Sequence, residues 1–152
     1  MAAVSPISGD GACEFCAIVL GDVQPEIVYE DANTIAFVPL EPAGPGHTLV
    51  IPREHIACLW ELSDEVAGHV IRTVTRVAVA LHEVLDPEGM NLINSSGEAA
   101  TQTVFHLHMH LVPRWVGDHM GAIWPPSSHW GEPNIGRTAE RLRDVLTNSP
   151  HC

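Results

Sequence analysis

The chain has 152 residues and a formal net charge of −12, with only seven Lys and Arg residues. Partners that present many phosphates, such as DNA, RNA or an anionic membrane, need a basic protein face, so this charge argues against all three. The length fits one domain with a real core, and 45% hydrophobic residues is typical of a globular protein. One small phosphate-bearing ligand remains compatible, because backbone N–H groups, imidazoles and hydroxyls can hold it.

The start of the chain is predicted to lack a targeting signal. Residues 1–11 contain neither a basic residue nor a hydrophobic run, and no stretch of about 18 apolar residues follows. We therefore expect a cytoplasmic protein without a membrane span. Residues 1–12 are predicted to form a disordered tail, and residues 13–152 are predicted to form the domain.

Two cysteines near the start, Cys13 and Cys16, form a CxxC motif. In a reducing compartment this spacing is typical of half a zinc site or of a redox pair, and two unrelated thiols are the third interpretation. A redox pair normally lies between a strand and a helix, and no suitable strand precedes this one. A tetrahedral zinc site would need two more ligands, which the ten His residues of the chain can supply.

Hydrophobic periodicity predicts the main elements in chain order. Strands are predicted at residues 26–29, 34–38, 47–52, 90–93 and 104–112, with a hairpin turn at residues 31–33. One long helix is predicted from Ser63, its N-cap, to Leu85, because six apolar residues share one stripe: Val66, Val70, Val74, Val77, Leu81 and Leu85. A short C-terminal helix is predicted at residues 138–146, with Leu142, Val145 and Leu146 on its apolar side.

Three histidines alternate with apolar residues between His106 and Val112. On a β-strand such an alternation places the imidazoles on one face, roughly 6–7 Å apart, and the apolar side chains on the other. Two chemistries use a row of this kind. The imidazoles can bind a metal ion, or one of them can attack an anionic substrate while a neighbour donates a proton and the third orients the reacting groups. The polar loop at residues 94–103 favours phosphate chemistry, because phosphate oxygens need neutral hydrogen-bond donors.

These residues resemble the histidine triad (HIT) superfamily, whose signature alternates three His with apolar residues and ends in two apolar residues. The segment from His106 to Val112 meets that signature at every position. The likeness extends from Cys13 to Trp124 and is nearest to bacterial proteins of the Hint and Fhit type. It implies an α+β fold in which an antiparallel sheet of about five strands carries one long helix and one short C-terminal helix, and it implies a homodimer.

The resemblance also implies an activity and its residues. Relatives hydrolyse or transfer purine nucleotides at the α-phosphate, so nucleoside phosphoramidates, aminoacyl adenylates and dinucleoside polyphosphates are the expected substrates. His108 would be the nucleophile and would carry a nucleotidyl group, His110 would contact the phosphate or leaving group, and His106 and His47 would support them. The implied substrate-binding residues are Phe37, Asn94, Gln102 and Thr103. Catalysis would require no cofactor.

The resemblance further implies a structural zinc ion, held by Cys13, Cys16, His55 and His106. It also reveals one departure: Pro39 stands where many relatives have an Asp that binds the ribose hydroxyls, and Glu41 is the candidate substitute. Two alternatives for the function remain open here. One is a zinc-dependent hydrolase that uses His106, His108 and His110 as ligands, and the other is a nucleotide-binding protein without catalysis.

Overall fold

The computed structural model describes residues 13–125 and 134–148 of the chain, so the tail predicted at residues 1–12 lies outside the described residues. The chain divides into two compact units, of which the first ends at His119 and the second begins at Met120. The grouping of residues 13–152 into one domain stays a prediction. Among the helices of the described ranges, none combines the length and apolarity that a bilayer crossing requires.

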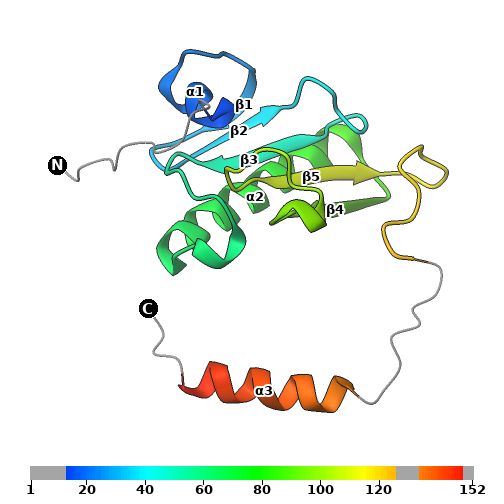
Figure 1. Cartoon of the computed structure of the whole chain (residues 1–152). Coiled ribbons are helices and arrows are strands. Elements are labelled where there is room, and N and C mark those ends of the chain that lie inside the picture. The colour runs from blue at the N-terminus through cyan, green and yellow to red at the C-terminus, as the bar shows by residue number, and fades with distance from the viewer. Residues whose placement is uncertain (1–12, 126–133, 149–152) are drawn as a thin grey trace. The chain divides into compact units, whose positions relative to one another are not determined.

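A five-stranded antiparallel sheet forms the first unit (Figure 1). The strand order is β1-β2-β3-β5-β4. The predicted turn joins the first two strands, since Asp31 Oδ1 accepts hydrogen bonds from the backbone N–H groups of Asn33 and Thr34. The predicted α+β fold with an antiparallel sheet of about five strands is confirmed. The strands have these bounds: β1 Glu26–Glu30, β2 Thr34–Val38, β3 Thr48–Pro52, β4 Gly89–Ile93 and β5 Met109–Arg114.

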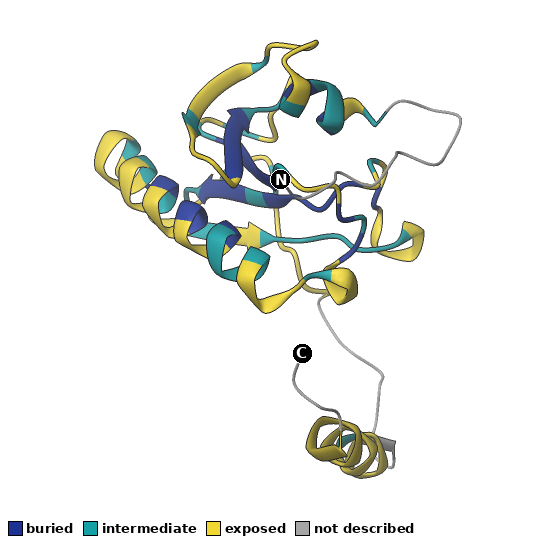
Figure 2. Ribbon diagram, turned by 90° about the vertical axis from the view of Figure 1, so that its left-hand side faces the viewer, coloured by how far each residue is buried: buried dark blue, intermediate teal, exposed yellow. Residues whose placement is uncertain are grey.

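The long helix α2, Asp64–Leu85, covers one face of this sheet. It begins at the predicted N-cap, because Ser63 Oγ accepts the backbone N–H of Val66. Its buried side faces the sheet and its other side is exposed, as Figure 2 shows. The core between helix and sheet contains Ala36, Val50, Val70, Val74, Val77, Leu107, Met109 and Leu111. Burial of this apolar surface is the main favourable term that holds the two layers together.

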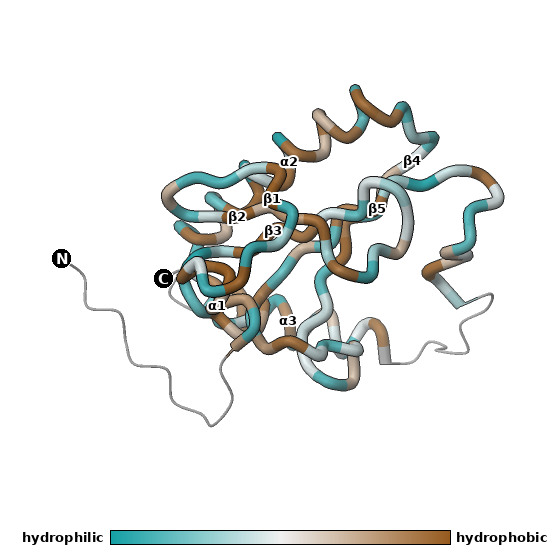
Figure 3. The backbone as a smooth tube through the Cα atoms, turned by 90° about the horizontal axis from the view of Figure 1, so that it is seen from above, coloured by the Kyte–Doolittle hydropathy of each residue, from teal (hydrophilic) through white to brown (hydrophobic). Residues whose placement is uncertain are grey.

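A short helix that the sequence did not predict, α1 at Glu14–Leu20, covers the opposite face. Its two buried side chains, Phe15 and Ile18, pack against Ile35, Phe37, Leu49 and Ile51 of β2 and β3. Because side chains alternate along a strand, these residues point away from α2. Both faces of the central strands are therefore buried, which explains why hydrophobic residues run continuously along β2 and β3 (Figure 3).

The predicted strand at residues 104–112 is wrong at its start, since β5 begins only at Met109. The last residue pair between β3 and β5 joins Val50 to Met109, so no ladder partner holds His106 or His108. The alternation persists nevertheless, because Leu107, Met109 and Leu111 are all buried in the core under α2. Two 3₁₀ turns, Leu59–Glu61 and Glu98–Ala100, lie in the loops of this unit.

The second unit contains the C-terminal helix α3, which spans Asn134–Asn148 and is longer at both ends than the predicted helix. The predicted apolar side exists, but Leu142, Val145 and Leu146 are each more than half exposed.

Candidate functional site

The imidazole of His108 is held in one tautomer by the backbone. Its Nδ1 lies 2.7 Å from the carbonyl oxygen of His106, and because a carbonyl can only accept, Nδ1 carries the hydrogen. In the neutral ring Nε2 then keeps its lone pair. The ring is nearly buried, and Phe15 of α1 contacts it edge-on at 5.2 Å between centroids. His108 therefore presents an unprotonated, oriented nitrogen on the α1 side of the sheet.

A second pair of imidazoles, His47 and His110, forms a directed hydrogen-bond chain. Nδ1 of His47 accepts the backbone N–H of Ala43 at 2.9 Å, so its hydrogen is on Nε2. That Nε2–H donates to Nδ1 of His110 at 2.9 Å, which leaves the hydrogen of His110 on Nε2. The ring of His110 lies 4.9 Å from that of His108, between centroids. A lone pair on His108 and an N–H donor on His110 thus stand on neighbouring rings.

Gly46 positions His47 within the loop that precedes β3. Its φ of +77° lies in the left-handed region, where L side chains are strained, and a Cβ there would lie 2.5 Å from Cδ1 of Leu85 and 3.1 Å from Cγ of Pro113. Glycine therefore allows the loop to approach the end of α2 closely. The carbonyl oxygen of Gly46 also accepts from the Thr48 hydroxyl at 2.9 Å.

Burial lowers the pKa of the four imidazoles. It lowers the pKa of His47 and His108, and it lowers the pKa of His106 and of His110 to about 4 each. For His106 and His110 the value of about 4 already includes repulsion from neighbouring imidazoles, which adds to the effect of burial. All four rings are therefore neutral near pH 7, which is the state that the hydrogen-bond directions require.

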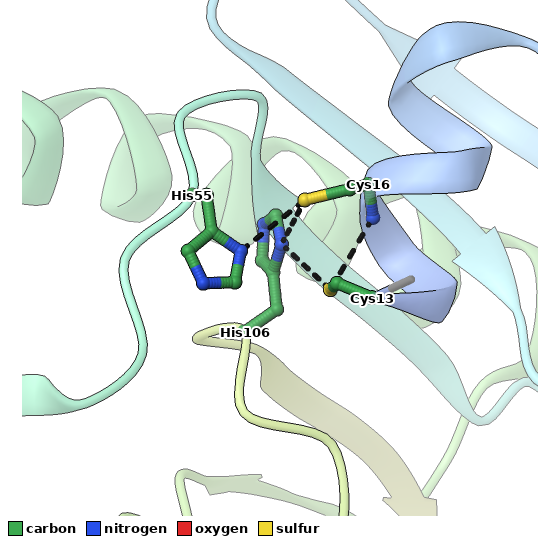
Figure 4. Close-up of side chains that lie close together, drawn as sticks. All are labelled: Cys13, Cys16, His55 and His106. Carbon is green, nitrogen blue, oxygen red and sulfur yellow. Dashed lines mark hydrogen bonds between the residues drawn. The ribbon is translucent and has the colours of Figure 1, made fainter. Parts of the chain in front are cut away.

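Four side chains from three segments gather into a candidate metal site, as Figure 4 shows. Cys13 and Cys16 come from the start of α1, His55 from the turn after β3, and His106 from the segment before β5. One ligand atom from each lies within 4.8 Å of the other three. Two sulfur and two nitrogen donors at this separation suit a tetrahedral zinc ion.

The tautomer of His106 fits the same site. Its Nε2–H donates to the carbonyl oxygen of Pro52 at 2.8 Å, so Nδ1 keeps a lone pair. That Nδ1 lies 3.6 Å from the sulfur atoms of both Cys13 and Cys16. Burial raises the pKa of the Cys16 thiol to about 11, with a further contribution from Cys13, so an ion would have to displace a proton there.

Gln102, predicted to bind substrate, holds its own loop together. Its Nε2 donates to the carbonyl oxygens of Ala57 and Val104, and its Oε1 accepts the backbone N–H of Gly97 at 2.7 Å. The thiol of the buried Cys58 also donates to Oε1, over 3.6 Å. The side chain is buried and its hydrogen bonds point inward, so it fixes the shape of the loop from Gly97 to Gln102.

The other predicted substrate-binding residues lie at varied depths. Asn94 donates from Nδ2 to the carbonyl oxygen of His108 at 3.0 Å, and Thr103 is exposed. Phe37 is buried and meets Phe15 edge-on at 5.5 Å between ring centroids. Their contacts with substrate stay predictions, as does a ribose contact by Glu41, which is exposed two residues after Pro39. Sequence reasoning missed Phe15, although its place between the two cysteines was a usable signal.

Comparison with known proteins places the chain among relatives. The family model described as HIT domain matches residues 21–116. Protein hit of Bacillus subtilis is 43% identical over 113 residues, which cover 74% of this chain and 78% of that protein. Adenosine 5′-monophosphoramidase hnt1 of Schizosaccharomyces pombe is 37% identical over 115 residues, which cover 75% of this chain and 84% of that enzyme.

Solved structures agree with the fold. A HIT family protein from Bacillus anthracis matches with a TM-score of 0.81 at 36% identity, covering 91% of this chain and 98% of that one. A Zn-bound histidine triad family protein from Mycobacterium smegmatis matches with a TM-score of 0.67 at 36% identity, covering 90% of this chain and 94% of that one.

Proposed function

The chain belongs to the HIT family, and from this premise we propose that it hydrolyses or transfers purine nucleotide conjugates at the α-phosphate, with His108 as the nucleophile. The observation that carries the proposal is the tautomer of His108. Because Nδ1–H is occupied by the carbonyl oxygen of His106, the lone pair on Nε2 is free to attack. A neutral, oriented imidazole is a far better nucleophile than water toward an anionic phosphodiester.

In the first step Nε2 of His108 forms a bond to the α-phosphorus, and the bond from phosphorus to the leaving group breaks. The electron pair of that bond departs with the leaving group, and an amine leaving group takes up a proton from solvent. His110 supports this step through its Nε2–H, which can donate to a phosphoryl oxygen where negative charge accumulates. His47 keeps that hydrogen on Nε2 of His110, because its own Nε2–H donates to Nδ1 of the same ring.

In the second step water attacks the same phosphorus and releases the nucleotide. The bond between phosphorus and His108 breaks, its electron pair returns to Nε2, and that nitrogen takes up the proton of the attacking water before passing it to solvent. Splitting one difficult displacement into two easier ones is the advantage of the covalent route. Another acceptor in place of water would make the protein a transferase.

A zinc ion at Cys13, Cys16, His55 and His106 would cross-link the fold and take no part in these steps, because four protein ligands close its coordination. The alternative, a catalytic ion shared by His106, His108 and His110, fits the geometry poorly. Nε2 of His106 donates to Pro52, and its Nδ1 faces the two cysteines. His106 therefore has no lone pair left for an ion at His108.

The substrate class rests on similarity. The relative from Schizosaccharomyces pombe is named an adenosine 5′-monophosphoramidase, so adenosine 5′-phosphoramidate is the first substrate to test.

A homodimer in the cytoplasm is part of the same proposal. The dimer is supported by the position of β4 at the sheet edge and by the exposed side chain of Leu92 on that strand. Light scattering of the purified chain would test the dimer.

The test of the chemistry is a substitution of the nucleophile. His108→Ala should abolish hydrolysis of adenosine 5′-phosphoramidate, while the exposed His82→Ala on α2 should leave it unchanged. Mass spectrometry of the quenched wild-type reaction should find a nucleotidyl group on the peptide that contains His108. Full activity of His108→Ala would refute the mechanism in which His108 is the nucleophile. Tight nucleotide binding without product over a broad substrate panel would favour the non-catalytic alternative.

A further inference from the structure

We propose that the metal site positions the nucleophile, so that Cys13, Cys16 and His55 act as positioning residues for His108 through His106. This inference rests on the proposed function for its kinetic consequence, but its central claim concerns the tautomer and orientation of one ring. The site would then do more than stabilise the fold. Its occupation by the ion would set the fraction of molecules in which Nε2 of His108 can attack phosphorus.

The imidazole of His108 is held by the backbone of His106 through one hydrogen bond of 2.7 Å. His106 is fully buried, and its carbonyl oxygen is the acceptor that keeps the hydrogen of His108 on Nδ1. Any rotation of the His106 peptide therefore removes the interaction that selects the reactive tautomer of His108. In the other neutral tautomer the hydrogen would occupy Nε2, and that nitrogen could not attack phosphorus.

Other restraints act on the His106–His108 segment: Leu107 is buried in the core, and Asn94 Nδ2 donates to the carbonyl oxygen of His108. The segment precedes β5, so the sheet ladder does not hold it. The turn from Pro52 to Ile56 holds it instead: Pro52 accepts from the His106 ring, and the carbonyl oxygen of Ile56 accepts the backbone N–H of Leu107. His55 lies in that same turn, so an ion bound by His55 and His106 would tie the turn and the segment to each other.

The same ion would also fasten α1 to the nucleophile. This helix has only seven residues, and a helix of that length is unstable without tertiary contacts. Its Phe15, between the two cysteines, contacts the rings of both His106 and His108 edge-on, at 5.9 and 5.2 Å between centroids. Losing the cysteine ligands would therefore loosen one wall against which the His108 ring is packed.

Without the ion, weak contacts remain. The sulfur atoms of Cys13 and Cys16 lie 3.6 Å from Nδ1 of His106, and that of Cys16 lies 3.2 Å from Nδ1 of His55. Thiols are weak hydrogen-bond donors, so these contacts restrain His106 far less than metal–ligand bonds would. Loss of partners that orient a reactive group from outside the reacting atoms typically costs about 10- to 100-fold in activity.

The test reads the tautomer of His108 directly, by two-dimensional ¹⁵N–¹H NMR of the imidazole rings in the full-length protein. The signal of His108 is assigned by its loss in His108→Gln. In zinc-loaded protein we expect one Nδ1–H tautomer, and after zinc removal by a chelator we expect a mixture or an exchange-broadened signal. In parallel, kcat on adenosine 5′-phosphoramidate should fall at least about tenfold with little change in KM. Zinc content is measured on every sample.

Two variants of the exposed His55 sharpen the test. His55→Gln removes a ligand and should reproduce the change at His108, while His55→Cys keeps a ligand and should restore both zinc and the Nδ1–H tautomer. His82→Gln, an exposed histidine on α2, is the matched control and should change neither. If chelation unfolds the chain, the comparison is made on His55→Gln at saturating zinc, where the turn is no longer tied to the ion.

An unchanged Nδ1–H signal of His108 after zinc removal, or in His55→Gln at saturating zinc when chelation unfolds the chain, would overturn the proposal. This outcome is separate from failure of the proposed function. If His108→Ala keeps full activity, the enzyme mechanism fails, while the tautomer measurement still decides whether the metal site orients the ring.

Discussion

Nε2 of His47 lies 2.9 Å from Nδ1 of His110, and the direction of this hydrogen bond is fixed from the far side of His47 by the backbone N–H of Ala43. The backbone N–H of Ala43 therefore determines, through the ring of His47, which nitrogen of His110 carries the hydrogen. In the proposed mechanism, His47 would therefore act on the substrate through the imidazole of His110.

His47→Ala should lower kcat about tenfold. Without His47 the imidazole of His110 is free to change tautomer, and the transition state then loses a hydrogen bond that contributes about 1.4 kcal/mol. His47→Gln should recover part of the loss, since an amide can accept from Ala43 and donate to His110. Steady-state kinetics on adenosine 5′-phosphoramidate would measure both, with His82→Ala as the control. An unchanged kcat in His47→Ala would contradict the directed chain.

The stability of the protein should fall between about pH 6.5 and pH 4. Burial first, and repulsion from His108 and His47 second, lowers the pKa of His110 to about 4, and burial lowers that of His47. In this window the unfolded chain binds more protons than the folded one, so the free energy of unfolding decreases as the pH falls. Above about pH 6.5 the histidines are neutral in both states, and their contribution to stability is complete. Urea unfolding at several pH values would measure the slope.

His110→Gln should flatten that slope, because it removes one group that takes up a proton on unfolding. The exposed His82→Gln should leave the slope as in the wild type. Equal slopes in the wild type and His110→Gln would show that His110 is not a neutral, buried imidazole in the folded protein.

Zinc should raise the thermal midpoint of the wild type and leave Cys16→Ala almost unaffected. An ion present at about 1,000 times its Kd stabilises the folded state by about 4 kcal/mol, which corresponds to a shift of about 10 °C for a chain of this size. Differential scanning calorimetry with increasing zinc would measure the shift. Cys58→Ala, which changes a cysteine outside the cluster, should keep the zinc dependence. A zinc-dependent midpoint in Cys16→Ala would place the ion elsewhere.

Gly46→Ala should destabilise the protein by about 2 kcal/mol and lower kcat, because the φ of +77° strains an L residue and a Cβ would crowd Leu85, Leu81 and Pro113. Gly44→Ala, two residues earlier, is the matched control, since a Cβ there meets nothing within 4 Å. Thermal midpoints and kcat would be measured for both variants. Equal midpoints for the two would mean that the loop before His47 tolerates another conformation.

The elements that local patterns predicted are those whose restraints are local. The hairpin after β1 depends on Asp31 and the next three residues, and α2 begins at Ser63, which caps its own first turn. The helix α1 was missed because seven residues with two buried side chains give too short a pattern. Gly21, with a φ of +83° at its C-terminal end, was the signal that marked it.

The site was predicted in composition but not in geometry. Spacing alone could pair Cys13 with Cys16, but only the resemblance suggested His55 and His106, and the structure brings these four together. The start of β5 could not be read from alternation, since the turn at Pro52–Ile56, more than 50 residues away, holds His106 without a ladder. Contacts of that sequence separation leave no local trace in a pattern of hydrophobicity.

Gln102 and Thr103 are neighbours with different expected roles, and two substitutions should separate them. Gln102→Ala leaves the carbonyl oxygen of Ala57 and the backbone N–H of Gly97 without their partner, so it should lower the free energy of unfolding by about 2 kcal/mol. Thr103→Ala changes an exposed hydroxyl, so stability should stay within about 0.5 kcal/mol of the wild type. If the hydroxyl contacts phosphate, kcat/KM should nevertheless fall about tenfold. Urea unfolding and kinetics on both variants would decide, and a Thr103→Ala enzyme with unchanged kcat/KM would remove Thr103 from the substrate-binding residues.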